Sequence, residues 1–478
     1  MFALSRARLI RSALALALLS LALVMLVGCN DAGSGSTGVI PPGDAVIASS
    51  ITANRTLYRD TLYTIRGFIQ VTNGAVLTIQ SGTVIHGDFA TVGSSLFITR
   101  GARIEALGTA SAPIVFTSSR PVGQRRAGDW GGLILIGNGI INRAAPVVLE
   151  GTGTGPDNPS QVYSGGSNNA DNSGTLRYVR IEFAGYATAA DQELNSLTLA
   201  AVGSGTALEY VEALYGLDDS FEFFGGAVDG KYLVSYEAGD DHFDMSEGYV
   251  GRLQYLIAYQ SAKVTVRPGA GNASNDPQGI ENDGCNGTGC ALGQNSIPFT
   301  IPVVANFTLV GTGPGTDVDP TSGGYGAILR RGTGGYYVNG ILARWPKGAF
   351  GLRDAATQTR ISDGIFDARN ILAVETPSLF TTASSGFVLS DSVARGITRD
   401  AAASTSSLFS TFTIPATTAT SFDWTPPAGS LAAAGGLTTF TGNLATAAGT
   451  FVAGTSYRGA AAPGGTKWWL GWTHYATN

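Results

Sequence analysis

Two segments of the sequence decide the fold: Asp218-Asp219-Ser220-Phe221-Glu222-Phe223 and Asp240-Asp241-His242-Phe243-Asp244-Met245. They match position by position at an offset of 22 residues. Two looser repeats accompany them. Leu-Arg recurs after 23 residues, at 329–330 and 352–353, and a tyrosine followed by valine or leucine begins at Tyr178, Tyr210, Tyr232, Tyr255 and Tyr337. A period near 22 predicts a solenoid, in which each repeat forms one coil and stacked coils bury a shared core.

The segments between glycine turns alternate apolar and polar residues, which indicates β-strands. Residues 75–79, 95–98 and 113–117 are further examples of such segments. A helical repeat would need a 3.6-residue periodicity, and a β-propeller would need blades of about 40–45 residues. The sequence therefore predicts an all-β fold, a right-handed parallel β-helix of about 22 residues per coil over residues 45–400. Long loop insertions are expected at 151–175 and 268–296, and residues 401–478 are expected to cap the solenoid or pack along its side.

Composition narrows the functional classes. The chain has 478 residues, of which 66 are glycine and 44% are hydrophobic, so disorder is excluded as its main state. Only 13% of the residues are charged, and the net charge is −6. A nucleic-acid-binding protein needs a basic surface, so nucleic acid is not an expected partner. Low charge with abundant glycine is typical of a β-rich extracellular protein.

The first 28 residues are predicted to be a signal peptide. Arg6, Arg8 and Arg11 precede an apolar run over residues 12–27, and no stop-transfer segment follows. The run ends in Leu26-Val27-Gly28-Cys29, which resembles the bacterial lipobox. This resemblance implies cleavage before Cys29 and lipidation of Cys29, whereas a plain secretory signal is the alternative. Residues 29–44 are then a flexible tether, and the protein is an outer-membrane lipoprotein that faces either the cell surface or the periplasm.

Two further cysteines lie close together in the second long loop. Cys285 and Cys290 are separated by four residues, Asn-Gly-Thr-Gly. In an exported protein such a pair most simply forms a local disulfide. A zinc site is the alternative, although the neighbouring sequence offers no histidine or further cysteine as a ligand.

The 22-residue repeat predicts an acidic column on the solenoid surface. Side chains alternate between the two faces of a strand, so Phe221, Phe223, Phe243 and Met245 are expected to point inward and Ser220, Glu222, His242 and Asp244 outward. Glu222 would stack on Asp244, and Asp218 on Asp240, at about 4.8 Å between coils. Glu281 is expected to form a third rung of the column, and Arg330 and Arg353 to continue it with the opposite charge.

Carboxylates stacked this closely repel one another unless one is protonated or a cation binds between them. Calcium accepts six to eight oxygen ligands, so a calcium site is predicted from these side chains. The alternative is a solvated acidic ladder, balanced by Arg330, Arg331 and Lys231, in which the aspartate pairs only shape turns. The predicted cation ligands are Asp218, Asp219, Glu222, Asp240, Asp241 and Asp244.

Several motifs resemble a group of bacterial surface proteins and lipoproteins. They are Gly128-Asp-Trp-Gly-Gly, Ala201-Val-Gly-Ser-Gly-Thr, Phe221-Glu-Phe-Phe-Gly-Gly, Leu329-Arg-Arg-Gly and Gly471-Trp-Thr. The resemblance covers roughly residues 50–478 and implies a parallel β-helix, but little about activity. More distantly, the architecture resembles pectate lyases and polygalacturonases.

These distant resemblances imply two catalytic alternatives. A lyase would hold calcium with carboxylates and use an arginine or lysine base, for which Arg330, Arg331, Arg252 and Lys263 are candidates. A hydrolase would use paired carboxylates such as Asp240-Asp241. The Gly-His-Gly and Arg-Ile-Lys segments of polygalacturonases do not occur in this sequence, which weakens the hydrolase hypothesis. The catalytic candidates are Arg330, Arg331 and Asp241.

Two functional hypotheses therefore stand. The first is a non-catalytic, lipid-anchored surface protein that binds glycan, matrix or a protein partner and holds a cation at its acidic face, for which Ca²⁺ is the candidate. The second is a calcium-assisted polysaccharide lyase or a glycoside hydrolase acting on an acidic polysaccharide. Trp130 and Trp345 are interpreted as packing residues rather than sugar platforms, and His242 as either a metal ligand or base or a structural residue.

Overall fold

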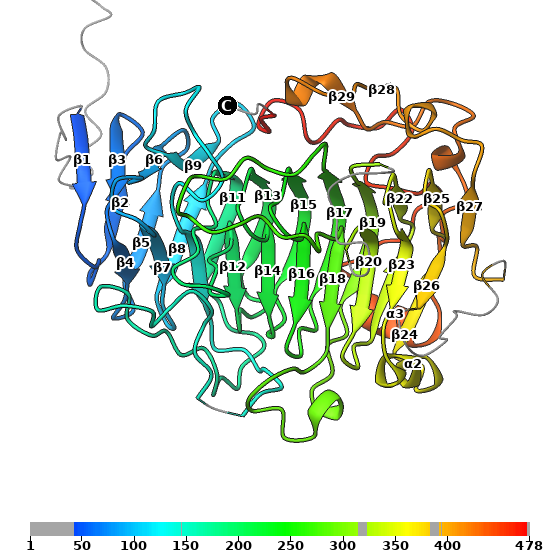
Figure 1. Ribbon diagram of the computed structural model, residues 1–478, viewed down its shortest axis with the longest axis horizontal. Helices are drawn as coiled ribbons and strands as arrows, with labels where there is room; N and C mark the ends of the chain where they lie inside the picture. The colour runs from blue at the N-terminus through cyan, green and yellow to red at the C-terminus, as the bar shows by residue number, and fades with distance from the viewer. Residues whose placement is uncertain (1–42, 145, 314–322, 383–391, 393, 476–478) are drawn as a thin grey trace, which may run out of the picture. The chain divides into compact units, whose positions relative to one another are not determined.

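The computed structural model describes residues 43–478 apart from 145, 314–322, 383–391, 393 and 476–478. The predicted signal peptide, Cys29 and nearly all of the tether lie outside these residues. Two parallel sheets run side by side through residues 43–400, with strands of one alternating along the chain with strands of the other (Figure 1). We call the 17-stranded sheet "sheet A" and the 10-stranded sheet "sheet B".

Sheet B carries the residues of the predicted acidic column. Its strands, in spatial order, are β4 (Phe68–Val71), β7 (Ser95–Ile98), β10 (Gly132–Ile136), β12 (Leu197–Ala200), β14 (Phe221–Phe224), β16 (Phe243–Ser246), β18 (Ile280–Asp283), β20 (Tyr325–Arg330), β23 (Gly348–Leu352) and β26 (Phe380–Thr382).

Sheet A contains the strands of each coil that do not belong to sheet B. Its strands, in chain order, are β1 (Gly43–Ile47), β2 (Arg55–Leu57), β3 (Thr61–Ile65), β5 (Val76–Ile79), β6 (Val84–Gly87), β8 (Arg103–Leu107), β9 (Ile114–Ser118), β11 (Gly174–Glu182), β13 (Ala207–Leu214), β15 (Asp229–Tyr236), β17 (Arg252–Tyr259), β19 (Val303–Val310), β21 (Gly335–Val338), β22 (Ile341–Ala343), β24 (Phe366–Arg369), β25 (Leu372–Val374) and β27 (Thr398–Asp400).

The remaining described elements are short. The helices are α2 (Ala355–Ser362) and α3 (Gly442–Ala448), and the 3₁₀ turns are η2 (Gly293–Asn295), η3 (Thr405–Ser407), η4 (Ala419–Ser421) and η5 (Leu431–Ala433). Strands β28 (Thr411–Phe412) and β29 (Phe422–Asp423) form a small antiparallel pair. In the described ranges, none of the helices combines the length and apolar character of a membrane span.

The strand register confirms a parallel β-helix. Phe221 pairs with Phe243 and Glu222 with Asp244, which is the 22-residue offset seen in the sequence. Leu329 pairs with Leu352 at the 23-residue offset. Long insertions interrupt the chain without shifting the ladder: β10 pairs with β12 in register although residues 137–196 lie between them. The segments 75–79 and 95–98 are both strands, but they belong to different sheets rather than to successive rungs.

Alternation fills the interior with stacked apolar side chains. Phe221 lies on Phe243 with ring centroids 5.1 Å apart, and both are fully buried. Each such side chain contributes roughly 1.5–3 kcal/mol through burial of apolar surface. Trp130 and Trp345 also belong to this core, with 0% and 3% exposure, so both are packing residues as interpreted.

The tyrosine repeat marks a corner of the coil that has a positive φ. Tyr178, Tyr210, Tyr232 and Tyr255 have φ between 51° and 66°, and their rings stack at centroid spacings of 4.4, 4.5 and 5.0 Å. Tyr337, the fifth predicted member, does not belong to this stack. It is a fully buried residue of β21 paired with Val304, and Asn306 and Asn339 carry the positive φ in the later coils. Asparagine tolerates the left-handed region better than most residues do.

Residues after β27 return along sheet A (orange to red in Figure 1). Trp472 meets Tyr178 of β11 edge-on at 5.8 Å, and the Tyr475 hydroxyl donates to the Glu237 carboxylate at 2.5 Å. Trp469 and Trp472 are fully buried in a cluster with residues of β13, β15 and β17. This C-terminal segment therefore covers a sheet face that would otherwise expose apolar side chains.

Candidate cation-binding groove

The floor of the groove is a column of carboxylates on adjacent strands of sheet B. Glu222 of β14 is in register with Asp244 of β16, which is in register with Glu281 of β18. Their strand neighbours Phe221, Phe243 and Ile280 point into the core. The acidic side chains therefore point to the outer face, as the repeat predicted, and Glu281 forms the expected third rung.

The turns before β14 and β16 bring four aspartates to one end of this column. Asp219 Oδ1 accepts a hydrogen bond from the Asp241 backbone N–H at 2.8 Å, and Asp241 Oδ1 accepts one from the Gln278 N–H. Asp219 and Asp241 therefore also order the turns, as the alternative interpretation expected. By contrast, Asp240 Oδ1 and Asp244 Oδ1 are buried and have no hydrogen-bond partner among the described residues.

These carboxylates line a cavity of about 210 Å³ whose lining contains ten acidic residues and one arginine. Glu150 and Glu193 reach it from the loops between β10 and β12, and Asp276 reaches it from the loop before β18. An adjoining cavity of about 430 Å³ shares Glu222, Asp244 and Glu281 and extends to Glu247, Asp283 and Arg331. We call the two cavities together the acidic groove.

Three sets of carboxylate oxygens within the groove lie close enough to share a cation. In each set, the oxygens lie within 4.8 Å of one another. The atoms that would bind the cation are all carboxylate oxygens, which are the hard ligands that calcium prefers. The sets are Asp218 with Asp219 and Asp240, Asp219 with Glu222 and Asp244, and Asp241 with Asp244 and Glu281. The structure thus brings together all six side chains that the sequence nominated.

Burial is the main cause of the raised carboxyl pKa values in the groove. It raises the pKa of Asp219 to about 6, and together with neighbouring carboxylates such as Asp283 it raises the pKa of Glu281 to about 8. The pKa values of Glu222 and Asp244 lie well above their ordinary range for the same two reasons. In the absence of a cation, the folded protein therefore holds protons on part of this column at neutral pH.

Two arginines close one end of the acidic groove. Arg330 pairs with Glu281 and, at 2.7 Å from its Nε, with Asp283, while Arg331 also pairs with Asp283. The sequence placed Arg330 directly beside Glu281 in the column. In the structure, Arg330 is in register with Asp283, and Glu281 is in register with Ile328. Arg353, the other expected member, lies 3.8 Å from Asp276. Asp283 was missed as a site residue, although its position two residues after Glu281 placed it on the same strand face.

The other basic candidates take different positions. Arg252 lies on β17 of sheet A, where it pairs with Asp229 at 2.5 Å, so it is not part of the groove floor. Lys263 donates to the Asn275 side chain at 2.5 Å. Neighbouring acids raise the pKa of Arg330, which makes it a poor proton acceptor.

The expectation that Ser220 and His242 point outward is wrong. His242 Nδ1 lies 2.5 Å from the Ser235 hydroxyl, which donates to Ser220 at 2.7 Å. These residues come just before their strands, so strict alternation does not extend to them. Burial lowers the pKa of His242 to about 3, so this imidazole is a neutral internal residue rather than a ligand or base in the groove.

Loop residues that the sequence did not single out form the roof of the groove. Arg143 lies 2.5 Å from Glu247, whose carboxylate also accepts a hydrogen bond from the Tyr163 hydroxyl at 2.5 Å. Arg143 Nε donates to the Thr288 carbonyl at 2.9 Å, inside the loop closed by the Cys285–Cys290 bond. The predicted disulfide is confirmed, and it braces the loop that positions Arg143.

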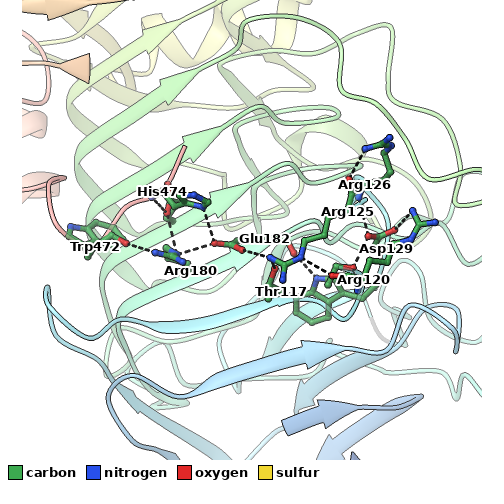
Figure 2. A network of polar contacts seen from close by, with 12 residues as sticks. Thr117, Arg120, Arg125, Arg126, Asp129, Arg180, Glu182, Trp472 and His474 are labelled. Atoms are coloured by element: carbon green, nitrogen blue, oxygen red, sulfur yellow. Dashed lines mark hydrogen bonds and ion pairs between the residues drawn. The ribbon is translucent and has the colours of Figure 1, made fainter. Parts of the chain in front are cut away.

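A second polar network lies beside the C-terminal segment and serves as a contrast. Figure 2 shows the buried Glu182 carboxylate among Arg180, Arg125 and His474, with Arg180 Nε at 3.0 Å. These partners lower the pKa of Glu182 despite its burial. In this network the carboxylate is neutralised by protein groups, whereas the acidic groove has far fewer cations than acids.

The sequence matches the family described as "Pectate-lyase like beta helix domain" over residues 49–417, most of the chain. The chain belongs to the pectate-lyase-like β-helix family. Comparisons with curated proteins and with solved structures found no match. Family membership agrees with the two parallel sheets and with the distant resemblance stated above. A pectate-lyase-like β-helix is a scaffold that carries many different sites, so function has to be argued from the groove itself.

Proposed function

We propose that this pectate-lyase-like β-helix is an exported, glycan-binding surface protein that holds a divalent cation, calcium, in its acidic groove. One observation carries the proposal: the carboxylates of Glu222, Asp244 and Glu281 are stacked, Glu222 and Glu281 are buried, and the buried Asp244 Oδ1 has no donor among the described residues. The ligands would be drawn from the six predicted carboxylates and Glu281. A bound cation would supply the positive charge that the protein does not.

The burial of these side chains argues against a merely solvated ladder. Glu222 is 5% exposed, Asp241 3% and Glu281 8%. Water cannot screen charges buried to that degree, and an ionised carboxylate that is buried without a partner is unfavourable by several kcal/mol. A cation or shared protons must therefore balance the groove.

The cellular setting of the proposal rests on the sequence. The lipobox-like segment ending at Cys29 supports export and anchoring in the outer membrane by a lipid on Cys29. The confirmed disulfide supports an oxidising compartment. Glycan, matrix or a surface protein is the proposed partner, because a long solenoid presents an extended surface.

The test is the thermal stability of the purified protein in Ca²⁺ and in EDTA. We expect Ca²⁺ to raise the melting temperature, with stabilisation of about 2.7 kcal/mol at a hundredfold excess over Kd. Glu222→Gln should abolish the calcium effect. Glu209→Gln is the matched control, because Glu209 is an exposed residue of sheet A paired with Arg177. An equal calcium response in both variants would refute the site.

A second candidate function is glycoside hydrolysis at the same groove. Asp219 and Glu222 lie side by side, and burial raises the pKa of both carboxyl groups, that of Asp219 to about 6. A pair of neighbouring carboxyl groups, one of which keeps a proton near neutral pH, is the arrangement that acid–base cleavage of a glycosidic bond uses. The lyase alternative is weaker, because Arg330 is held in its charged form by Glu281 and Asp283.

Product chemistry separates these candidates. Incubation with acidic polysaccharides would release reducing ends if the protein is a hydrolase, and ultraviolet-absorbing unsaturated ends if it is a lyase. Binding without either product would support the non-catalytic proposal. Asp219→Asn should remove hydrolysis completely if Asp219 and Glu222 form the acid–base pair.

A further inference from the structure

A separate cavity of about 450 Å³ lies at the β4 end of sheet B. Its lining includes Phe68 at the start of β4, Val92 from the turn before β7, and Tyr186 from the loop after β11. Val92 is 50% exposed although it is apolar. Asp157 is the only charged residue among the described residues of the lining, so this cavity differs in chemistry from the acidic groove.

Gly93 keeps the space between the two aromatic rings open. A Cβ atom at this position would lie 3.0 Å from Phe68 Cζ and 3.5 Å from Tyr186 Cδ1. The φ of Gly93 is +72°, a conformation that glycine adopts without strain. Any larger residue would therefore both strain the turn and fill the gap between the rings.

Polar groups accompany the rings. Asn158 is 4% exposed, and its amide nitrogen donates to the Gly151 carbonyl at 2.7 Å and to Thr154 Oγ1 at 2.8 Å. Its Oδ1 atom accepts no hydrogen bond from any residue that the structure describes. Thr91 and Thr188 also belong to the lining. A buried carbonyl oxygen without a donor is unfavourable, so a ligand hydroxyl group that reached Asn158 Oδ1 would be stabilising.

Aromatic faces beside hydroxyl and amide groups, with almost no charge, suit a ring that has one apolar face and several hydroxyls. We propose that this cavity binds a neutral sugar residue of a glycan. Tyr186 and Thr188 also line the neighbouring hollow that contains Asp218 and Asp240, so the cavity opens toward the acidic groove. The inference rests on the proposed glycan-binding function and assigns the neutral part of that ligand to a place in the fold.

The test uses neutral gluco-, manno- and xylo-hexaoses as probes, with binding to the full-length protein measured by calorimetry. Val92→Trp should plug the cavity and weaken binding about tenfold or more, equivalent to about 1.4 kcal/mol. Val122→Trp is the matched control, because Val122 is 71% exposed and does not line the cavity. Both sites are exposed, so both variants should fold, which equal melting temperatures would show.

Binding is measured in both Ca²⁺ and EDTA so that the two proposals fail separately. The neutral-sugar site has no carboxylate cluster, so binding should persist in EDTA even if the acidic groove binds no calcium. Absence of binding by all three hexaoses would overturn the inference. So would equal affinities of the two tryptophan variants, or binding that requires Ca²⁺, since either result would place the sugar elsewhere.

Discussion

Two carboxyl groups of this protein have opposite electrostatic surroundings. Glu182 is buried beside Arg180 and His474, and its pKa is lowered. Asp244 is stacked between Glu222 and Glu281, and its pKa is raised by burial and by the charges of Glu281 and Asp219. The protein supplies basic partners for Glu182, whereas the acidic residues around Asp244 outnumber the basic ones. The difference makes Asp244 the most informative residue for substitution.

Asp244→Asn should change stability with opposite signs in the two conditions. In EDTA the substitution removes a buried, repelling carboxyl group, so the melting temperature should rise. In saturating Ca²⁺ it removes a ligand, so the melting temperature should fall below that of the wild type. Differential scanning calorimetry in both buffers measures the two shifts. The same sign in both buffers would contradict the cation site.

Arg330→Gln should destabilise the protein at neutral pH. Arg330 pairs with both Glu281 and Asp283, whose side chains are buried, so its loss leaves two acids without that partner. Breaking a buried ion pair costs about 3–5 kcal/mol. Urea unfolding would measure the loss. Arg331→Gln should cost less, because the Arg331 side chain is 34% exposed and, within the described part of the chain, pairs with Asp283 alone.

At the level of strands, the sequence predicted the register correctly where one coil repeats the pattern of the previous coil. The 22-residue offset correctly placed Phe221 on Phe243 and Glu222 on Asp244. Alternation failed for His242 because turn residues before a strand do not follow the pleat. The repeat also misplaced Arg330 by one outward position, because a long loop separates β18 from β20 and hides the register.

The roof of the groove was beyond sequence reasoning for a different reason. Arg143 and Glu247 meet although they are 104 residues apart, and no repeat relates them. Contacts of this kind depend on how loops fold over the ladder, which local patterns do not encode. Cys285–Cys290 was predictable because the two cysteines are close in the chain.

The stacked strands of the groove should make stability depend on pH in a defined direction. Burial raises the pKa of Glu281 and of Glu150 to about 8, above their ordinary value of 4.5. The folded state therefore binds more protons than the unfolded state between about pH 4.5 and 8, and the free energy of unfolding should fall as pH rises through that window. Urea titrations in EDTA from pH 5 to 8 would show this, and Ca²⁺ should flatten the slope. A rise in stability with pH in EDTA would contradict the assignment.

For the molecule as a whole, the C-terminal segment is an integral part of the fold. Trp472 is fully buried and contacts Tyr178 and Tyr210, and the backbone N–H of His474 donates to Glu212 at 2.9 Å. These contacts join the last residues of the described chain to β11 and β13 rather than to the last coils. The segment thereby links parts of the solenoid that are distant in sequence.

Trp472→Ala should cost about 3–5 kcal/mol in the free energy of unfolding, the usual loss when a large aromatic side chain is removed from a core. It should also expose the tyrosine stack to solvent. Urea unfolding followed by tyrosine fluorescence would report both effects. Trp468→Ala should cost less, because Trp468 is only half-buried. Trp468 also contacts the tyrosine stack, at Tyr232 with ring centroids 5.2 Å apart, so equal losses would show that the deeper burial of Trp472 adds nothing to stability.

The return of the C-terminal segment also has a mechanical consequence. If the chain were pulled by its two ends, force applied at the C-terminus would enter the molecule at β11 and β13, where Trp472 and His474 are attached. The segment would shear away from sheet A before the later coils, β25 and β27 among them, carried any load. Those coils would carry no force until the contacts of Trp472 with the tyrosines had broken. The C-terminal segment would therefore be the first part of the molecule to extend.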